Sequence, residues 1–315
     1  MRVLQIAKLT GGIARHVRET SAHSHHDSYC LDYDHAINIP LLRAFTFIFL
    51  GLPIGLFRIL KNRIDIIHAH YLIPAGLLGV LLGKLTRKPV VVTVHGSDAM
   101  RLSQLNFLKR WVGRNSQVIT TTKYLQNRLK TIGIASRVIP NGLDHGKISQ
   151  APPKKLKKPA ITFVGSLIPN KVGILPELLN GQYNFYIIGD GPMGDELGGT
   201  KLGQLPPEEV YSYLKGSDIF ISTSKWEGFG LAILEAMACG VPVIARPNSG
   251  QAELVENRGI LADSSLEFKA GIARLLNDPK LRNRSIKEGL KFSRQFSWEA
   301  TSNGIDRIYE LSKGR

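Results

Sequence analysis

The sequence predicts an α/β protein made of two doubly wound domains, each with a parallel sheet, and three observations lead to this fold class. Short apolar runs typical of buried strands alternate along the chain with apolar or amphipathic helical segments. Residues 219–245 read as strand, glycine-containing loop, helix and strand, and such a βαβ unit requires a parallel sheet. The 315 residues, 43% of them hydrophobic, are enough for two domains of ordinary size.

The expected domain boundary is a stretch rich in proline and lysine at residues 150–159, which reads as an exposed linker. We therefore expect an N-terminal domain over residues 1–150 and a C-terminal domain over residues 151–295. The remaining residues, 296–315, are amphipathic and are expected to form a last helix.

The N-terminal domain is expected to open with a strand at residues 3–7, the glycines Gly11 and Gly12, and a helix from residue 13. This order of strand, glycine turn and helix is typical of a doubly wound domain. Its further elements are expected to be strands at 64–69, 88–94 and 117–122 and helices at 75–85 and 123–132. The polar residues 21–28, with three histidines, read as a solvated loop because no acid or cysteine stands at metal-ligand spacing.

The segment 44–57 has no charged residue and is flanked by Arg43 and Arg58. Its fourteen residues are fewer than the roughly 20 that span a bilayer, and Pro53 interrupts them. A buried helix is the default interpretation. The alternative is a helix that lies in the membrane interface, with the flanking arginines on lipid headgroups.

Charge is distributed unevenly along the chain, whose net charge is +16. Residues 1–150 carry 20 Lys and Arg against 7 Asp and Glu, whereas residues 151–315 carry 21 against 18. A basic N-terminal domain suits an anionic membrane or an anionic acceptor, and a solvated basic surface is the plain alternative. No zinc-finger, RNA-recognition or aromatic–basic pattern is present, so nucleic acid is not expected as a partner.

The cysteines and the N-terminus bear on the cellular compartment. Cys30 and Cys239 give no disulfide framework, which fits a reducing environment. The chain begins directly with a predicted strand and not with a signal-peptide pattern. We expect a cytoplasmic protein, with a peripheral position at the inner face of the membrane if residues 44–57 lie in the interface.

The C-terminal domain is expected to form the elements of a second doubly wound sheet. These are strands at 160–164, 185–188, 201–205, 219–222, 241–245 and 259–262 and helices at 208–215, 231–238, 267–276 and 279–292. Gly240 and Pro242 end the helix at 231–238.

The loop that precedes this helix has the composition of a ligand site. Gly228 and Gly230 lack Cβ atoms, so a ligand can approach the backbone closely, and the start of the following helix suits a phosphate. Glu227 in the loop and Glu235 two turns into the helix bracket this site. Because a carboxylate beside a phosphate is unfavourable, both glutamates are expected to face hydroxyls, and a nucleotide sugar offers hydroxyls and phosphates together.

Residues 227–243, Glu-Gly-Phe-Gly-Leu-Ala-Ile-Leu-Glu-Ala-Met-Ala-Cys-Gly-Val-Pro-Val, resemble the retaining glycosyltransferases of family 4. The resemblance extends over nearly the whole chain. It implies the GT-B fold, in which two Rossmann-like domains face each other across a cleft and a C-terminal helix crosses back onto the first. It also implies that Glu235 holds the ribose hydroxyls and that Glu227 contacts the donor sugar or orients the loop. The backbone of Phe229, Gly230 and Leu231 would hold hydroxyl and phosphate oxygens.

Histidines at the ends of two expected strands match the same family. His95 begins the sequence His-Gly-Ser-Asp, and in the family the histidine of this motif reaches the donor sugar. His68, His70 and Asp98 are weaker candidates for the acceptor site, because a histidine at a strand end is often only packed and hydrogen-bonded. The position of all three histidines agrees with the rule that α/β sheets bind ligands at the carboxyl ends of their strands.

Other donor-site expectations come from the resemblance alone. Gly11 and Gly12 would lie under the donor phosphates, and the short strand ending at Leu205 would meet the nucleobase. Gly189–Gly194 also match a dinucleotide signature by letter, but Pro192 lies inside it, so a dehydrogenase is not expected.

The sharpest departure from the family lies at Gly165, Ser166 and Lys171. The family usually has Gly-Arg-x-x-x-x-Lys-Gly here, and its arginine and lysine neutralise the donor diphosphate. Lys171 is present, but Ser166 stands at the arginine position, and Ser cannot make the bidentate phosphate contacts of Arg. Another basic residue then substitutes, or turnover is slow, or the donor sits differently.

The expected function is that of a retaining hexosyltransferase. It would move a sugar from a UDP- or GDP-sugar to an acceptor hydroxyl, in a lipid-linked or membrane-surface glycan, by front-face attack. His95, Glu227 and Lys171 are the expected catalytic residues. No Asp-x-Asp stands in the context that binds a metal, so no metal and no cofactor are expected. A catalytically weak nucleotide-sugar-binding subunit and a nucleotide-sugar epimerase are the alternatives.

Overall fold

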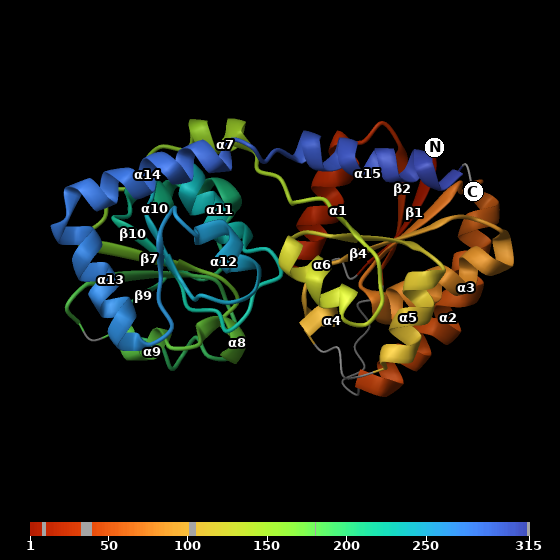
Figure 1. Ribbon diagram of the computed structural model, residues 1–315, viewed down its shortest axis with the longest axis horizontal. Coiled ribbons are helices and arrows are strands. Elements are labelled where there is room, and N and C mark those ends of the chain that lie inside the picture. The colour runs from red at the N-terminus through yellow and green to blue at the C-terminus, as the bar shows by residue number, and fades with distance from the viewer. Residues whose placement is uncertain (8–10, 33–39, 101–104, 180, 314–315) are drawn as a thin grey trace. The chain divides into compact units, whose positions relative to one another are not determined.

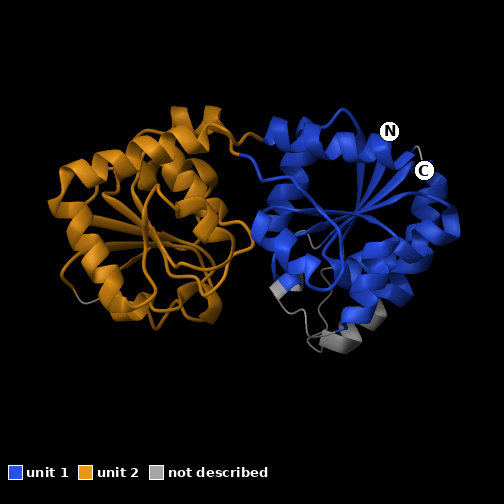
Figure 2. Cartoon of the chain, in the orientation of Figure 1, with its two compact units in different colours: residues 1–142, 298–315 blue, residues 143–297 orange. Residues whose placement is uncertain are grey.

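The computed structural model describes residues 1–7, 11–32, 40–100, 105–179 and 181–313, without the side chains of residues 40–46, 98 and 100. The chain forms two compact units, which are coloured separately in Figure 2. Unit 1 comprises residues 1–142 and 298–315, and unit 2 comprises residues 143–297. Each unit has its own parallel sheet of six strands. The α/β architecture expected from the sequence is confirmed.

Unit 1 contains six strands, β1 (Arg2–Ala7), β2 (Asp27–Asp32), β3 (Ile66–His70), β4 (Val90–Val94), β5 (Gln117–Thr120) and β6 (Arg137–Val138). Its helices are α1 (Gly11–His23), α2 (Pro40–Lys61), the π-helical turn η1 (Leu72–Gly76), α3 (Leu77–Thr86), α4 (Ser97–Met100), α5 (Asn106–Arg114), α6 (Lys123–Lys130) and α15 (Trp298–Lys313). The strand order is β2-β1-β3-β4-β5-β6, so the connections reverse direction between β1 and β3.

Hydrophobic cores cover both faces of this sheet, because successive strand residues point to opposite faces. On β3, Ile67 packs with helices α2, α3, α5 and α6, whereas its neighbour Ile66 packs with the last helix. In Figure 1 α1 and α15 lie together on one side of the sheet. Ile305, Ile308 and Tyr309 are the residues that α15 buries there. The last helix of the chain is therefore part of the N-terminal unit.

Strand β2 and the length of α2 differ from the sequence-based expectations. Residues 21–28 are only partly loop, since α1 continues to His23 and β2 starts at Asp27. The helix expected at 44–57 spans Pro40–Lys61 and is not buried all round. Gly51 and Gly55 pack against α3 so closely that a Cβ would lie 2.7 and 2.6 Å from leucine methyl groups. Its other side exposes five large apolar residues, Phe49, Leu50, Ile54, Phe57 and Leu60.

Unit 2 contains six strands, β7 (Ala160–Val164), β8 (Asn184–Ile188), β9 (Thr200–Lys201), β10 (Ile219–Ser222), β11 (Val243–Ala245) and β12 (Ile260–Leu261). Its helices are α7 (His145–Gln150), α8 (Pro169–Val172), α9 (Leu175–Leu178), α10 (Pro207–Gly216), α11 (Leu231–Ala238), α12 (Ser249–Val255), α13 (Ser265–Asn277) and α14 (Pro279–Ser293). The strand order is β12-β11-β10-β7-β8-β9, and the connections reverse direction between β7 and β10.

The expected linker at 150–159 lies inside unit 2, where the chain from α7 onward packs against the core. Ile148 and Ala151 belong to the same hydrophobic cluster as α10 and α11. The Lys215 amino group donates to the Ala151 carbonyl at 2.7 Å, which fixes the start of the stretch. Residues 152–155, 157 and 158 are exposed, as the composition suggested, but the start of the stretch is tied to α10. The strand expected at 201–205 is also shorter, because β9 is limited to two residues.

Two positions of unit 2 need glycine, one directly after β8 and one at the end of α8. Gly189 has φ +135°, and a Cβ there would lie 1.9 Å from the Gly165 carbonyl oxygen. Gly173 has φ +52°, and a Cβ would lie 2.2 Å from the Thr223 carbonyl oxygen. Both positions combine a left-handed backbone with close approach of another chain segment, and only glycine accommodates both. Both glycines let segments that follow strands of the unit 2 sheet approach one another closely.

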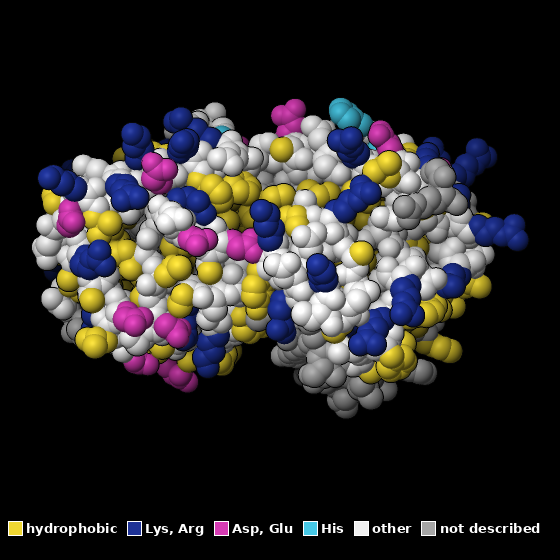
Figure 3. All heavy atoms as spheres, viewed as in Figure 1, with side chains coloured by type: hydrophobic (Ala, Val, Ile, Leu, Met, Phe, Trp, Pro, Cys, Tyr) yellow, Lys and Arg dark blue, Asp and Glu magenta, His cyan; other side chains and the backbone are white. Residues whose placement is uncertain are grey.

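Charge differs between the two units. On the face drawn in Figure 3, Asp and Glu side chains are more plentiful over unit 2, whereas Lys and Arg occur over both units. The difference agrees with the sequence, in which residues 1–150 carry most of the excess positive charge.

Among the described helices, none is long and apolar enough to cross a membrane.

Candidate active site

The candidate site of unit 2 lies at the carboxyl ends of β7 and β10, where the connections of its sheet reverse direction. Doubly wound sheets bind ligands in the crevice at such a point. Lys171 follows β7 and Glu227 follows β10, and Lys171 Nζ lies 2.5 Å from Glu227 Oε1. The Ser224 hydroxyl donates to the same carboxylate oxygen at 2.9 Å. The site thus combines a half-buried cation and a carboxylate that are 56 residues apart in sequence.

The loop between β10 and α11 is held by α12 and α8. The backbone N–H of Glu227 donates to Ser249 Oγ at 2.8 Å. Gln251, which is fully buried, donates to the Ser224 carbonyl at 2.9 Å and accepts from the Ser222 hydroxyl at 3.0 Å. From α8, Asn170 donates to the Trp226 carbonyl at 3.2 Å. The sequence analysis did not single out these positioning residues, because they come from helices distant in sequence.

The start of α11 has the backbone geometry expected from its glycines. Gly230 precedes the helix with φ +95°, a conformation that strains other residues. Phe229 is buried in the core, while Leu231 is half-buried. The helix start carries partial positive charge from its backbone N–H groups, which favours an anion.

Glu235 is almost completely buried, with 4% of its surface exposed. The hydroxyl of Tyr211, on the adjacent helix α10, donates to Glu235 Oε1 at 3.0 Å. A hydrogen bond to a carboxylate is stronger than one between neutral groups. Tyr211 therefore fixes the orientation of the second glutamate.

The remaining donor-site candidates are less tightly engaged. Ser166 is exposed, and Gly165 sits in the turn where its N–H donates to the Ile188 carbonyl. Leu205 is half-buried against the core. Two further cations lie at this edge of the sheet: Lys225 is exposed in the loop, and Arg246 is held by Asp263. Lys171 is accordingly the half-buried cation paired with a site carboxylate.

The candidate site of unit 1 is a cluster of histidines at the carboxyl ends of β3 and β4, and β3 borders the point between β1 and β3 where the connections of that sheet reverse direction. His68 and His70 stack on β3 with their ring centroids 4.5 Å apart. His70 Nε2–H donates to Gln5 Oε1 at 3.0 Å, so its Nδ1 accepts the Nε2–H of His95 at 2.9 Å. Two residues of this cluster, His16 and Gln5, were not among the expected site residues.

His16 and His68 complete the cluster through contacts with distant segments. His16, on α1, donates from Nδ1 to Asn141 Oδ1 at 2.9 Å, and its Nε2 is buried with no hydrogen-bond partner among the described residues. His68 bonds the Tyr309 hydroxyl at 2.6 Å and the Thr93 hydroxyl at 2.8 Å. These partners lie up to 241 residues away along the chain.

Burial keeps the histidine cluster neutral near pH 7. Desolvation lowers the pKa of His16 to about 4 and that of His68 to about 3. Burial also lowers the pKa values of His70 and His95 well below the usual 6.5. The rings therefore act as neutral hydrogen-bonding groups, and they do not supply positive charge to a phosphate.

Three of these histidines are also close enough to share a metal ion. One nitrogen each of His16, His70 and His95 lie within 4.8 Å of one another. Neutral imidazole nitrogens at such spacing are suitable ligands for zinc. However, both nitrogens of His70 are hydrogen-bonded, to His95 and to Gln5, so an ion here would have to displace one of these bonds.

The remaining candidates of unit 1 are Gly11, Gly12 and Asp98. Gly11 and Gly12 are the first residues of α1 and are exposed, and a Cβ on either would meet open space. The helix starts two residues before the expected position. The side chain of Asp98 lies outside the described residues, so its acceptor assignment is not tested.

Each of the two units thus has a parallel doubly wound sheet with a cluster of polar side chains near its reversal point. Residues 13–147 match the family model described as glycosyltransferase family 4, and residues 144–292 match the one described as glycosyl transferases group 1. An uncharacterised glycosyltransferase of Methanocaldococcus jannaschii is 31% identical over 297 residues, covering 87% of this chain and 84% of that protein. The chain belongs to the family 4 glycosyltransferases and is a hexosyltransferase.

A second relative is similar in sequence, and two solved structures show the same fold. An Escherichia coli UDP-Gal:α-D-GlcNAc-diphosphoundecaprenol α-1,3-galactosyltransferase is 30% identical over 65% of this chain and 63% of that protein. Sucrose-phosphate synthase of Thermosynechococcus elongatus matches with a TM-score of 0.80 and 20% identity over 99% and 98% of the two chains. Anabaena HepE, in complex with UDP and glucose, matches with a TM-score of 0.76 and 18% identity over 98% and 99%. The chain has the GT-B fold.

Proposed function

We propose that this glycosyltransferase moves a sugar from a UDP- or GDP-sugar to a hydroxyl of a lipid-linked or membrane-surface glycan, with retention at the anomeric carbon. The observation that carries the proposal is the Lys171–Glu227 pair at the reversal point of unit 2, with buried Glu235 on the helix that follows. Unit 2 would bind the nucleotide sugar and unit 1 the acceptor, at the cytoplasmic side of a membrane.

The donor assignment follows from the chemistry of this pair. Lys171 would meet the diphosphate, and Glu227 holds its amino group in place before a donor arrives. Glu227 and Glu235, which repel phosphate, suit sugar and ribose hydroxyls. The HepE structure holds UDP and glucose, which is consistent with a donor of this class. The binding experiment described below decides between UDP and GDP for this chain.

The reaction would proceed on one face of the donor sugar. The acceptor oxygen bonds to the anomeric carbon while the bond from that carbon to the diphosphate oxygen breaks. The acceptor proton passes to the departing phosphate oxygen, so charge and atoms balance. Lys171 would stabilise the negative charge that develops on the diphosphate. No paired carboxylates at glycosidase spacing are needed for this route.

His95 would contribute position and not charge, because its imidazole is neutral. Its Nε2–H is committed to His70, so Nδ1 and the backbone beyond β4 are the groups that it offers to a ligand. We propose that no metal takes part, since Lys171 supplies the charge that a metal would supply. Activity that survives EDTA is the expected result, and activity restored only by an added divalent ion would contradict it.

A lipid-linked acceptor is supported by the outer side of α2. Phe49 and Leu60 are 71% and 75% exposed on that helix, and Arg58 and Lys61 lie in its last turn. Apolar residues with flanking cations on one helix suit the headgroup region of an anionic membrane. The name of the Escherichia coli relative also specifies an undecaprenol-linked substrate.

Vesicle flotation tests this membrane contact. The protein is expected to float with phosphatidylglycerol vesicles at low salt and less well at high salt. Changing Phe49 and Phe57 together to Ser should reduce flotation several-fold, whereas the matched change Leu266→Ser, at an equally exposed leucine of unit 2, should not. Equal flotation of both variants would remove α2 from the proposal.

The central experiment is a donor screen on the purified protein. Calorimetry with UDP- and GDP-sugars is expected to find one nucleotide whose binding is lost in Glu235→Ala and kept in Glu177→Ala, an exposed glutamate of the same unit. Transfer is then measured with membrane extracts as the acceptor source. Normal donor binding by Glu235→Ala would refute the assignment of Glu235.

Ser166 favours one alternative, a nucleotide-sugar-binding subunit with little activity of its own. Its hydroxyl replaces the arginine common in the family, and it is exposed. Donor binding without transfer to any extract would support this alternative. Conversion of the donor sugar without an acceptor would support an epimerase.

A further inference from the structure

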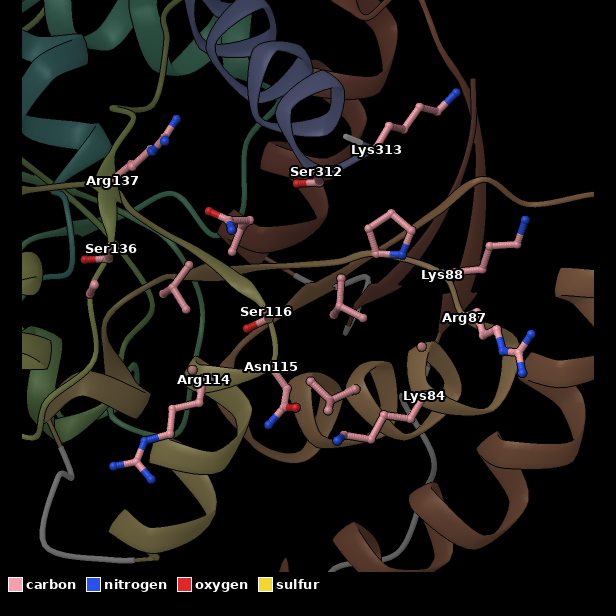
Figure 4. Close-up of a pocket in the computed structure, with 18 residues that line it drawn as sticks. Lys84, Arg87, Lys88, Arg114, Asn115, Ser116, Ser136, Arg137, Ser312 and Lys313 are labelled. Atoms are coloured by element: carbon pink, nitrogen blue, oxygen red, sulfur yellow. The ribbon is translucent and has the colours of Figure 1, made fainter. Parts of the chain in front are cut away.

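Unit 1 has a large hollow that lies far from its histidine cluster. It has a volume of about 830 Å³ and lies at the amino ends of β4, β5 and β6 (Figure 4). The histidine cluster occupies the carboxyl ends of the same sheet. Since a strand rises about 3.3 Å per residue, the five residues of β4 put about 15 Å between the two sites. The hollow therefore belongs to neither of the sites described above.

The lining of this hollow is strongly basic. Its eighteen residues include no Asp or Glu and six cations, Lys84, Arg87, Lys88, Arg114, Arg137 and Lys313. In Figure 4 these side chains are spread around the hollow, with Asn115 and Ser116 between them. None of the six forms an ion pair with an acid among the described residues. Two of the six, Lys313 and Lys88, interact electrostatically with Asp65, whose pKa is lowered chiefly by the backbone N–H of Arg2 and also by these two lysines.

Neutral hydrogen-bonding groups line the hollow beside the cations. Three hydroxyls, those of Ser116, Ser136 and Ser312, are among its lining residues. The Ser136 hydroxyl is buried and has no hydrogen-bond partner among the described residues. Hydroxyl groups beside cations are the neutral groups that add hydrogen bonds to phosphate oxygens.

Arg87 adds an independent observation. It ends α3 with φ +55° and ψ +33°, a left-handed conformation in which glycine is the usual residue. Arginine costs more than glycine in this conformation, so the helix end alone does not explain it. Strained residues of this kind concentrate at ligand sites.

We propose that this basic hollow binds a phosphate-bearing anion at a site separate from donor and acceptor. Its volume is within the range of small-molecule sites. Six positive charges that form no ion pair among the described residues repel one another, and a multiply charged phosphate relieves that repulsion. Arginine and hydroxyl groups together are the side chains that phosphate oxygens prefer.

Two apolar hollows adjoin the basic one, which bears on the source of the phosphate. One, lined by leucines with Phe107 and Trp111, shares Arg114 with the basic hollow. The other, lined by residues of α2 and α3 such as Leu60, shares Lys88 with it. A free diphosphate and a phosphorylated lipid headgroup have the same charged chemistry, but only the second would use the apolar hollows.

The test uses inorganic pyrophosphate as the probe, with calorimetry on the intact chain. Arg87→Gly is the informative variant, because glycine suits the left-handed backbone while the cation is lost. We expect Arg87→Gly to unfold at the same or a higher temperature and to bind pyrophosphate at least tenfold more weakly. Lys84→Gln and Lys88→Gln together should give a similar loss. Lys130→Gln, an exposed lysine elsewhere on unit 1, should give none.

A second variant separates this site from the donor site, which also suits a diphosphate. Pyrophosphate binding at the basic hollow must survive in Lys171→Ala. If all binding is lost in Lys171→Ala and none in the hollow variants, the proposal is overturned while the donor site stands. If Lys171→Ala leaves pyrophosphate binding unchanged and Arg87→Gly weakens it, the basic hollow is supported and the donor assignment of Lys171 is the one that fails.

Vesicles distinguish the two sources of phosphate. Vesicles with phosphatidic acid are compared with phosphatidylcholine vesicles, using the wild type and Arg87→Gly. Phosphatidic acid binding that is weakened in Arg87→Gly indicates a lipid headgroup, whereas pyrophosphate binding without any vesicle binding indicates a soluble anion. Failure of both probes to distinguish the wild type from Arg87→Gly would refute the site.

Discussion

Lys171 and Glu227 are the residues on which the proposed chemistry depends most directly. Their side chains are 28% and 16% exposed, so solvent screens the pair less than it would on the surface. We expect Lys171→Met to lower kcat about 100-fold, since one positioned charge at a developing anion contributes about 3 kcal/mol. Donor KM should change less than kcat. Initial rates at several donor concentrations measure both constants.

A double-mutant cycle separates catalysis by Lys171 from its support of Glu227. Glu227→Gln keeps the shape of the side chain and removes the charge that holds Lys171. If the double variant is no slower than Lys171→Met alone, the two residues act as one unit. If the losses multiply, Glu227 also contacts the substrate. Unchanged kcat in Lys171→Met would refute its role at the diphosphate.

Tyr211 is expected to act on the donor through Glu235. Tyr211→Phe removes the 3.0 Å hydrogen bond to a buried carboxylate and leaves the ring in place. A hydrogen bond to a charged group contributes about 2 kcal/mol, so donor affinity should fall up to about 30-fold. Calorimetry with the donor nucleotide measures this loss. Tyr213→Phe on the same helix is the matched control, and an equal loss there would contradict the assignment.

At the scale of elements, helix α12 connects local packing to the active-site loop. Gln251 makes three hydrogen bonds, to Ser222, Ser224 and Asn248, and is completely buried. Gln251→Leu leaves these partners unsatisfied, at a cost of about 1–3 kcal/mol. We expect both the urea midpoint and kcat to fall. Glu256 is exposed just after the same helix, so Glu256→Ala should alter neither quantity. A Gln251→Leu variant that is stable but inactive would show that the loop moves without loss of packing.

The elements that the sequence predicted well are those whose signal is local. The helix expected at 231–238 coincides with α11, because its apolar run and its glycine boundaries are contiguous in sequence. Strand β2 was missed because its burial pattern is mixed and its six residues include Ser, Tyr and Cys. The stretch 150–159 is largely exposed, as its prolines and lysines suggest, but it lies inside unit 2, because Ala151 is attached to α10 by Lys215, 64 residues further along the chain.

The candidate sites show the same division between local and long-range information. His70, His95, Glu227 and Glu235 could be singled out because each lies within or shortly after a recognisable element. His16 and Tyr309 were missed, since nothing near them in sequence indicates that α1 and α15 bring them to β3. In the sequence, the basic hollow is indicated only by the excess positive charge of residues 1–150. Its cations come from the ends of separate elements and from Lys313, so no local pattern marks it.

At the scale of the molecule, each unit has its own cores and its own titratable groups. The four buried histidines whose pKa values are lowered all belong to unit 1. The donor-site residues Lys171, Glu227 and Glu235 all belong to unit 2. The two units should therefore respond to different conditions, and thermal unfolding can follow them separately.

The sign of the pH effect follows from the lowered pKa values. An unfolded histidine has a pKa near 6.5, so below that pH the unfolded chain binds protons that folded His16 and His68 exclude. Above about pH 6.5, protonation of these histidines does not lower the stability of unit 1. It falls as the pH decreases toward about 4 for His16 and about 3 for His68. At pH 5.5 each such histidine destabilises unit 1 by about 1 kcal/mol.

Scanning calorimetry at pH 7.5 and 5.5, with and without the donor nucleotide, tests this independence. Acid should lower the transition of unit 1, whereas the nucleotide, at about 100 times its Kd, should stabilise unit 2 by about 3 kcal/mol and raise its transition. His68→Gln removes one titrating group and should reduce the acid shift, which separates histidine protonation from general acid unfolding. A single transition that responds equally to acid and nucleotide would mean that the two units unfold as one, and the separate cores would then not act as independent cooperative regions.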